Sequence, residues 1–161
     1  SNYRNEILNL IKKGVSTKKA VTQALKNDKL KEERQIAVIN LMGNAHVFSG
    51  NKTVRVSDSF IGKNFAIAGN MLANKSVVST MAKSFQKNTG TFLPKRLIKA
   101  LIAGEKRGGD KRGRLSAAII YYKPHYKTMT LRIDYSNNPL KALLAALELR
   151  YSEEYISILD S

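Results

Sequence analysis

Apolar residues first recur along the chain at a helical spacing. They predict one helix over 2–13, which Gly14 ends, and a second helix to about residue 27, which Ser16 is suited to cap. The link between these two segments is very short. The opening of the chain is therefore expected to form a helical hairpin.

Short segments rich in β-branched residues follow. Residues 34–41 and 45–48 are predicted strands, and the turn at 42–44 makes them a hairpin. Another short strand is expected over 64–68. The pattern over 54–58 is ambiguous, because it fits an extended segment without requiring one.

The rest of the chain returns to helices and then repeats the hairpin pattern. We expect helices over 75–87 and 94–103, a glycine-rich charged loop over 104–113, strands over 115–122 and 128–134, and a closing helix over 139–149. Hairpin strands and paired helices favour an α+β fold with largely antiparallel sheets layered with helices. The length of 161 residues favours a single domain over 1–161.

The composition excludes several classes of site. Hydrophobic residues make up 43% of the chain and charged residues 25%, as in ordinary globular proteins. The absence of cysteine excludes disulfides and thiolate nucleophiles, and His46 and His125 lack a metal-ligand spacing, so we expect neither a metal nor another cofactor. No apolar run is long enough for a membrane span and no signal peptide is visible, so a cytoplasmic location is expected.

The charge widens the range of possible partners. Twenty-eight Lys and Arg residues oppose twelve Asp and Glu residues, and the net charge of +16 attracts polyanions. The cations are spread along the chain, as on a lysine-rich solvated surface, yet several flank the glycine-rich loop. These are the candidate nucleic-acid contacts Lys95, Arg96, Lys99, Lys106, Arg107 and Lys111. Nearby tyrosines interleave with lysines, a pattern that suits RNA, at Tyr121, Tyr122, Lys123, Tyr126 and Lys127.

The most unusual stretch is GGDKRGRLSAA at 108–118. Its glycines allow positive φ and close backbone approach, and Arg112 and Arg114 offer forked donors for a carboxylate or phosphate. Asp110 is able to pair with either arginine, and Ser116 begins an otherwise apolar strand. The spacings of a phosphate loop and of a dinucleotide fingerprint are both absent. The residue types alone fit either a ligand site or, more simply, a structural loop held by an Asp–Arg pair.

Three further positions are candidates for chemistry. Gly69 permits a tight turn from strand to helix, and Asn70 either caps that helix or presents its amide to a reacting carbonyl. A free N-terminal Ser1 would carry nucleophile and base together, because its α-amino group can accept the hydroxyl proton. Ser1 leads into a predicted helix, however, whereas such nucleophiles usually begin a strand.

Taken in order, these motifs resemble a family of bacterial and archaeal proteins in the N-terminal-nucleophile (Ntn) hydrolase superfamily. Members carry a run similar to GGD-x-RG-x-QSAA, and here Leu115 takes the place of the usual Gln. The other segments that carry the resemblance are LNLIKKGVSTKKAVTQAL at 8–25, RQIAVINLMGNAHVFSG at 34–50, FAIAGNML at 65–72 and LRIDYSNNPLKALLAALEL at 131–149.

The resemblance implies a four-layer αββα sandwich and amide-bond hydrolysis of the amidohydrolase or peptidase kind. Arg112 and Arg114 would hold an anionic substrate group, and the oxyanion would lie near Asn70. The implied substrate site comprises Gly69, Asn70, Asp110, Arg112, Arg114 and Ser116. Family members begin with strands ahead of the first helix, one of which carries the nucleophile, and this chain lacks those strands.

Three explanations of the absent strands are open: a processed precursor, a portion of a longer protein that holds the C-terminal part of the sandwich, or a relative that has lost catalysis. We expect an upstream peptide or another chain to complete the sheet, because an open edge invites pairing, and an oligomer is therefore expected. The alternative function is a non-catalytic, highly basic module derived from this fold, which binds nucleic acid such as rRNA or takes part in a protein assembly.

Overall fold

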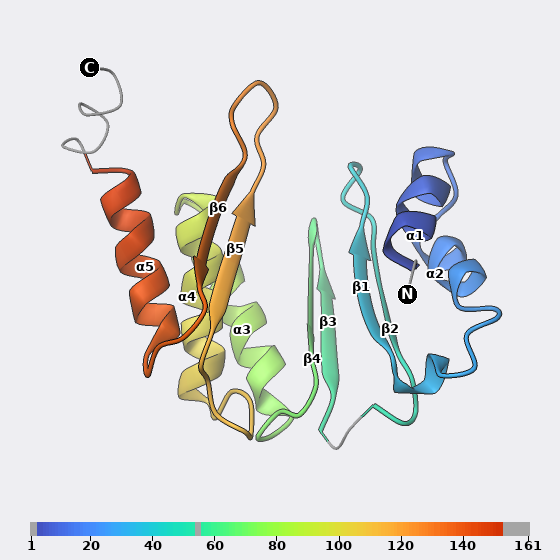
Figure 1. Cartoon of the computed structure of the whole chain (residues 1–161), viewed down its shortest axis with the longest axis horizontal. Helices are drawn as coiled ribbons and strands as arrows, with labels where there is room; N and C mark the ends of the chain where they lie inside the picture. The colour runs from blue at the N-terminus through green and yellow to red at the C-terminus, as the bar shows by residue number, and fades with distance from the viewer. Residues whose placement is uncertain (1–2, 54–55, 153–161) are drawn as a thin grey trace.

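The computed structural model describes residues 3–53 and 56–152, and it has a mixed α+β architecture (Figure 1). Five α-helices and six strands lie in this part of the chain. In chain order they are α1 Tyr3–Lys12, α2 Thr17–Ala24, the short 3-10 helix η1 Lys31–Glu33, β1 Gln35–Ile39, β2 Ala45–Ser49, β3 Asp58–Gly62, β4 Phe65–Gly69, α3 Ser76–Lys87, α4 Leu93–Lys106, β5 Ala117–Tyr121, β6 Met129–Ile133 and α5 Pro139–Arg150.

The six strands form three antiparallel hairpins, so the expectation of antiparallel sheets is confirmed. β1 pairs with β2, β3 with β4, and β5 with β6, and each pair is a two-stranded sheet. Chain neighbours pair in every case, because a short connection can join antiparallel strands directly.

The helical hairpin α1–α2 covers one face of β1–β2. Ser16 caps α2 as expected, since its Oγ accepts a hydrogen bond from the Lys19 amide at 3.4 Å. The buried residues of the two helices pack against Ile36, Val38 and Phe48, which lie on the strands. Alternate residues of β1 therefore face the helices, as the period of a strand requires.

Helices α3, α4 and α5 cover the other two hairpins. The α3 residues Val77 and Val78 pack with Phe60 and Ile67 of β3–β4. A separate cluster joins α4 and α5 to β5–β6, and its members are Ile98, Ile119, Met129, Leu143 and Leu147. Figure 1 shows α1–α2 at one end of the molecule and α5 at the other, with the hairpins between them.

The side chain of Gln35 links the first two hairpins. Its Nε2 donates to the Ser49 hydroxyl at 3.1 Å and to the backbone carbonyls of Asp58 and Gly69 at 3.3 and 3.1 Å. One amide thus joins β2 to both strands of the second hairpin. A polar side chain between two strand pairs is stabilising only when its hydrogen bonds are made, and these bonds fix how the two hairpins lie together.

Several element boundaries differ from the sequence expectation; α2, for example, ends at Ala24 rather than near residue 27. Two further differences concern β3 and α4. The third strand runs over 58–62 rather than 54–58, and the sequence pattern misses it because Asp58 and Gly62 disfavour strands. α4 continues to Lys106, although we expected a loop from 104 onward. Glycine at position 104 allows α3 to lie close against α4, because a Cβ there would meet Met81 Cγ at 2.6 Å.

No helix in the described ranges is long and apolar enough to cross a membrane.

The packing of α5 yields a stability prediction with a control on the same helix. Leu143 is fully buried and Leu149 is 62% exposed. Leu143→Ala should lower the free energy of unfolding by about 2–5 kcal/mol, because it leaves a cavity in the core. Leu149→Ala should change it by no more than about 0.5 kcal/mol. Urea denaturation measures both, and equal losses would contradict the assignment of the buried face.

Candidate functional site

The loop after α4 lies against the segment that follows β4. Leu72 forms an isolated β-bridge with Asp110. On either side of it the Ala73 amide donates to the Gly109 carbonyl at 3.0 Å, and the Lys111 amide donates to the Met71 carbonyl at 2.8 Å. Two motifs about forty residues apart in the sequence are therefore held together by backbone hydrogen bonds.

Glycines make this approach possible. Gly108 and Gly109 have φ values of +115° and +54°, a region that other residues rarely adopt. A Cβ on Gly108 would lie 2.7 Å from the Ala73 Cβ, so the space is also too small for a side chain. Asn74 strengthens the contact, because its Nδ2 donates to the Arg107 carbonyl at 2.8 Å.

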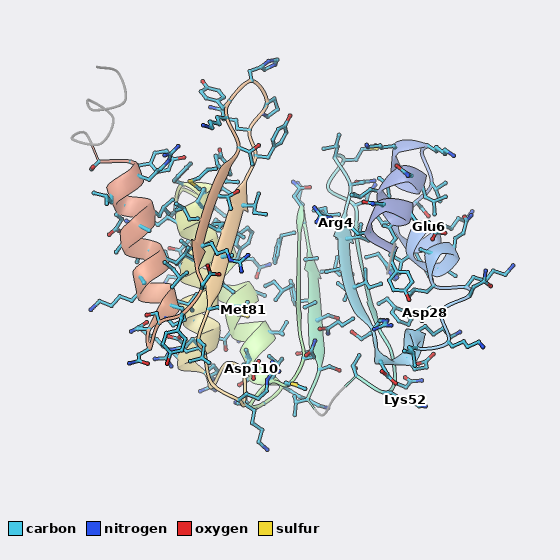
Figure 2. All side chains as sticks on the ribbon, in the orientation of Figure 1. Arg4, Glu6, Asp28, Lys52, Met81 and Asp110 are labelled. Atoms are coloured by element: carbon cyan, nitrogen blue, oxygen red, sulfur yellow. The ribbon has the colours of Figure 1, made fainter. Side chains whose placement is uncertain are left out.

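A cavity of about 390 Å³ opens beside this contact. Its polar rim brings together Gly69 at the end of β4, Asp110 and Arg114 of the loop, and Ser116 ahead of β5. The remaining wall is mostly apolar and comes from α3, α4 and the start of α5. Four of the six residues that the sequence selected for a substrate site thus line one cavity, and Asn70 and Arg112 do not. Figure 2 shows Met81 and Asp110, both in its wall, far from Arg4 and Asp28.

Arg112 pairs with Asp110 and folds the loop onto itself. Its Nη2 and Nε contact the carboxylate at 2.6 and 3.0 Å, and its backbone amide donates to the same group at 2.8 Å. These hydrogen bonds, with the positive charge of the guanidinium, lower the pKa of Asp110 below its usual value. The Asp–Arg pair expected from the sequence is therefore present within the loop.

Arg114 makes a different contact, with a residue that the sequence did not single out. Its Nε lies 2.7 Å from Oε1 of Glu105, whose side chain is only 20% exposed. That oxygen is buried, and the contact lacks the angles of a hydrogen bond. Glu105 was missed because we expected a loop there; the helical continuation of α4 turns it into the cavity.

Asn70 corrects one expectation. It is exposed and lies outside the cavity wall, and its Nδ2 donates to Gln35 Oε1 at 3.2 Å. It does not cap the next helix, since α3 begins at Ser76, whose amide is held by the Asn74 side chain at 2.9 Å. One N–H of the Asn70 amide therefore contributes to the link between hairpins, and the same –NH2 carries a second donor.

The nucleophile expected from the sequence, Ser1, lies outside the described residues. Within them, Ser116 supplies an exposed hydroxyl at the cavity, and neither histidine lines it. Burial and the charge of Lys18 lower the pKa of His46, which lies on β2. No group of three His, Asp or Glu side chains suited to a metal occurs over 3–53 and 56–152.

Most candidate nucleic-acid contacts have partners within the fold. Lys95 pairs with Glu148 at 2.8 Å, Lys99 donates to Asn88 Oδ1 at 3.1 Å, and Arg107 donates to Ser76 Oγ at 3.1 Å. The Arg96 guanidinium lies 3.7 Å from the centre of the Phe85 ring and donates to the Phe85 carbonyl. Lys106 and Lys111 are exposed. The six cations do not form one free surface.

The Asp110–Arg112 pair yields a pH prediction. Arg112→Ala should raise the pKa of Asp110 towards its ordinary value of about 4, because the stabilising donors are lost. Since the folded-state pKa is the lower one, the pair stabilises the loop above pH about 4, and this is lost as the pH falls through the lowered pKa. A ¹³C NMR titration measures it, with Arg132→Ala as the control; an ordinary pKa in the unmodified protein would contradict the assignment.

Comparison with known proteins places the chain in a family. Residues 1–143 match the model of a family of unknown function, DUF1028. The chain is also similar to the crystal structure of protein SPO2555 from Silicibacter pomeroyi, with a TM-score of 0.88 and 31% identity over 97% of this chain and 67% of that chain. No curated protein matches it. The chain therefore belongs to the DUF1028 family of unknown function.

Proposed function

We propose that the cavity binds the carboxylate-bearing end of an amide substrate, and that the chain forms the C-terminal portion of an Ntn-hydrolase-like sandwich that cleaves the amide bond. The observation that carries this proposal is the convergence of Gly69, Asp110, Arg114 and Ser116 on one cavity. These residues come from separate motifs of the sequence resemblance. Fold resemblance alone would not support the activity, so the argument depends on the site.

The roles follow from the contacts. Arg114 remains 48% exposed while its Nε faces Glu105, so its Nη groups are available to a substrate carboxylate. The Ser116 hydroxyl lies at the same rim and can donate a hydrogen bond to the reacting carbonyl oxygen. Asp110 and Arg112 shape the loop, and one N–H of the Asn70 amide is bound to Gln35.

The proposed chemistry needs a nucleophile from outside the described residues, either Ser1 of this chain or the first residue of a separate polypeptide. Its hydroxyl oxygen attacks the amide carbon while its α-amine takes the hydroxyl proton. The C–N bond then breaks, and the leaving amine receives that proton. Water next cleaves the ester, which releases the acid and restores the nucleophile.

A binding experiment tests the site. N-acetylated dipeptides, which carry an amide and a free carboxylate, should shift the backbone NMR signals of Gly69, Asp110 and Ser116. Arg114→Ala should weaken binding by about 10- to 100-fold, the loss expected for a charge-assisted hydrogen bond. Arg132→Ala is the matched control, because Arg132 is 71% exposed and pairs with Asp134 outside the cavity.

Activity is measured on the same dipeptides by the appearance of free amino groups. Binding at the cavity without amine release would rule out Ser1 of this chain as the nucleophile for these compounds, and only a separate polypeptide could then supply it. Shifts confined to residues outside the cavity would remove the site itself.

The basic binding module is the second proposal, and the hairpin loop after β5 supports it. Tyr122 and Tyr126 are 69% and 64% exposed, and the Lys123 ammonium lies 4.1 Å from the centre of the Tyr126 ring. Exposed aromatic rings beside lysines suit stacking with single-stranded RNA. The candidate cations near α4 support it less, because most of them have partners within the fold.

Salt dependence separates the two proposals. We expect oligo(U) RNA to bind weakly at low salt and to be released near 150 mM salt, as a diffuse charge of this sign predicts. Tight binding that persists at that salt and falls in a Tyr126→Ala variant would favour the binding module. Fluorescence anisotropy of labelled RNA measures both, with Tyr135→Ala, at an exposed tyrosine outside this loop, as the control.

A further inference from the structure

A second cavity, of about 340 Å³, lies between β4 and β5. Residues 65–68 of β4 and 118–120 of β5 line it without interruption. Side chains of a strand alternate between its two faces, so consecutive residues line the same cavity when the edge of the strand faces it. The cavity is therefore a groove between two strand edges. In Figure 1 β4 and β5 are the facing strands of their hairpins.

Both edges lack a partner strand in the described part of the chain. β4 pairs with β3 and β5 pairs with β6, and neither pairs with any other described strand. In an antiparallel pair, alternate residues direct their amide and carbonyl groups away from the partner. Each edge thus presents a row of backbone donors and acceptors to the groove, which is the arrangement that recruits a further strand.

The floor of the groove is apolar. Met81 and Phe85 of α3 and Leu97 and Leu101 of α4 lie beneath the two edges, and each of these leucines is 36% exposed. Ile120 on β5 is 68% exposed. Apolar side chains gathered in one groove indicate an interaction site, so an occupant needs one apolar face in addition to free backbone groups.

The directions of β4 and β5 decide what fits. The end of β4 and the start of β5 meet at the same side of the molecule, because Leu72 bridges Asp110 and both Gly69 and Ser116 line the neighbouring cavity. The two strands therefore run in opposite directions. A sheet that stays antiparallel throughout requires an even number of strands between them. The smallest such unit is a two-stranded hairpin, which one short turn can connect.

We propose that a β-hairpin fills this groove and joins β3–β4 and β5–β6 into one six-stranded antiparallel sheet. Its source is the part of the family's chain that has no counterpart in these residues. The similar Silicibacter pomeroyi protein has enough additional residues to supply such a hairpin, since this chain covers 67% of that protein and leaves about a third unmatched. The inserted hairpin carries apolar side chains on the face that meets α3 and α4.

A second copy of this chain fits less well. The occupant must offer a strand pair whose apolar face is free to cover α3 and α4. In this chain β1–β2 packs against α1–α2, β3–β4 against α3, and β5–β6 against α4 and α5. In each described hairpin the apolar face is therefore already packed against helices of the same chain.

The absence of cysteine allows a direct test. Single cysteines are placed in the groove by Ala66→Cys on β4 and Ala118→Cys on β5, and outside it by Ser59→Cys on β3, which is exposed. The rate at which iodoacetamide alkylates each cysteine is measured in the absence and in the presence of a probe. The probe is the unmatched part of the Silicibacter pomeroyi protein, produced as separate polypeptides. Circular dichroism of each variant is the control for retention of the fold.

We expect the probe to slow alkylation at positions 66 and 118 by about tenfold or more, because reaction then requires local opening of the added strands. Position 59 should react as before. Hydrogen exchange over residues 65–69 should slow with it, as new backbone hydrogen bonds form, and β1–β2 should be unchanged.

Unchanged alkylation at position 118 under saturating probe would overturn the proposal. Protection that rises with the concentration of this chain alone would assign the groove to a second copy and overturn it equally. The experiment measures docking of the hairpin rather than hydrolysis, so its outcome does not depend on whether the proposed function is correct.

Discussion

The site depends on one backbone contact, between residues 71–73 and 109–111. Two hydrogen bonds and a β-bridge tie the end of β4 to the loop ahead of β5, so the helices α3 and α4 are closed into a unit with both strands. The contact requires a positive φ at Gly108 and Gly109 and no side chain at Gly108. This contact closes the cavity at the end where β4 and the loop ahead of β5 meet.

Most cations beside the site interact with nearby groups of this chain. The chain carries +16, yet the cations beside the site are held by Glu148, Asp110, Glu105 and polar groups of α3. A paired cation on the surface contributes little to the free energy of folding, and its remaining donors can still contact a partner. High net charge therefore describes how the protein behaves near polyanions in general, and it does not identify a binding surface.

The hairpins set the second constraint. Each buries one face against its own helices, which satisfies its apolar side chains but leaves two strand edges open on the same apolar floor. The groove and the candidate site are neighbours, since Ala68, Met81, Leu101 and Ala118 line both cavities. A hairpin seated in the groove would thus border the candidate site, which couples completion of the sheet to that site.

The sequence by itself determined the local elements. Helical and alternating periods predicted the helices, most strands and two of the three hairpin pairings, because these depend on neighbours in the chain. Through the family resemblance it also selected six site residues, of which Gly69, Asp110, Arg114 and Ser116 line one cavity. The tertiary structure decided the rest: α4 continues past Gly104, Glu105 lines the cavity, and one N–H of the Asn70 amide is bound to Gln35. Those outcomes depend on which distant segments meet, and no local pattern contains that information.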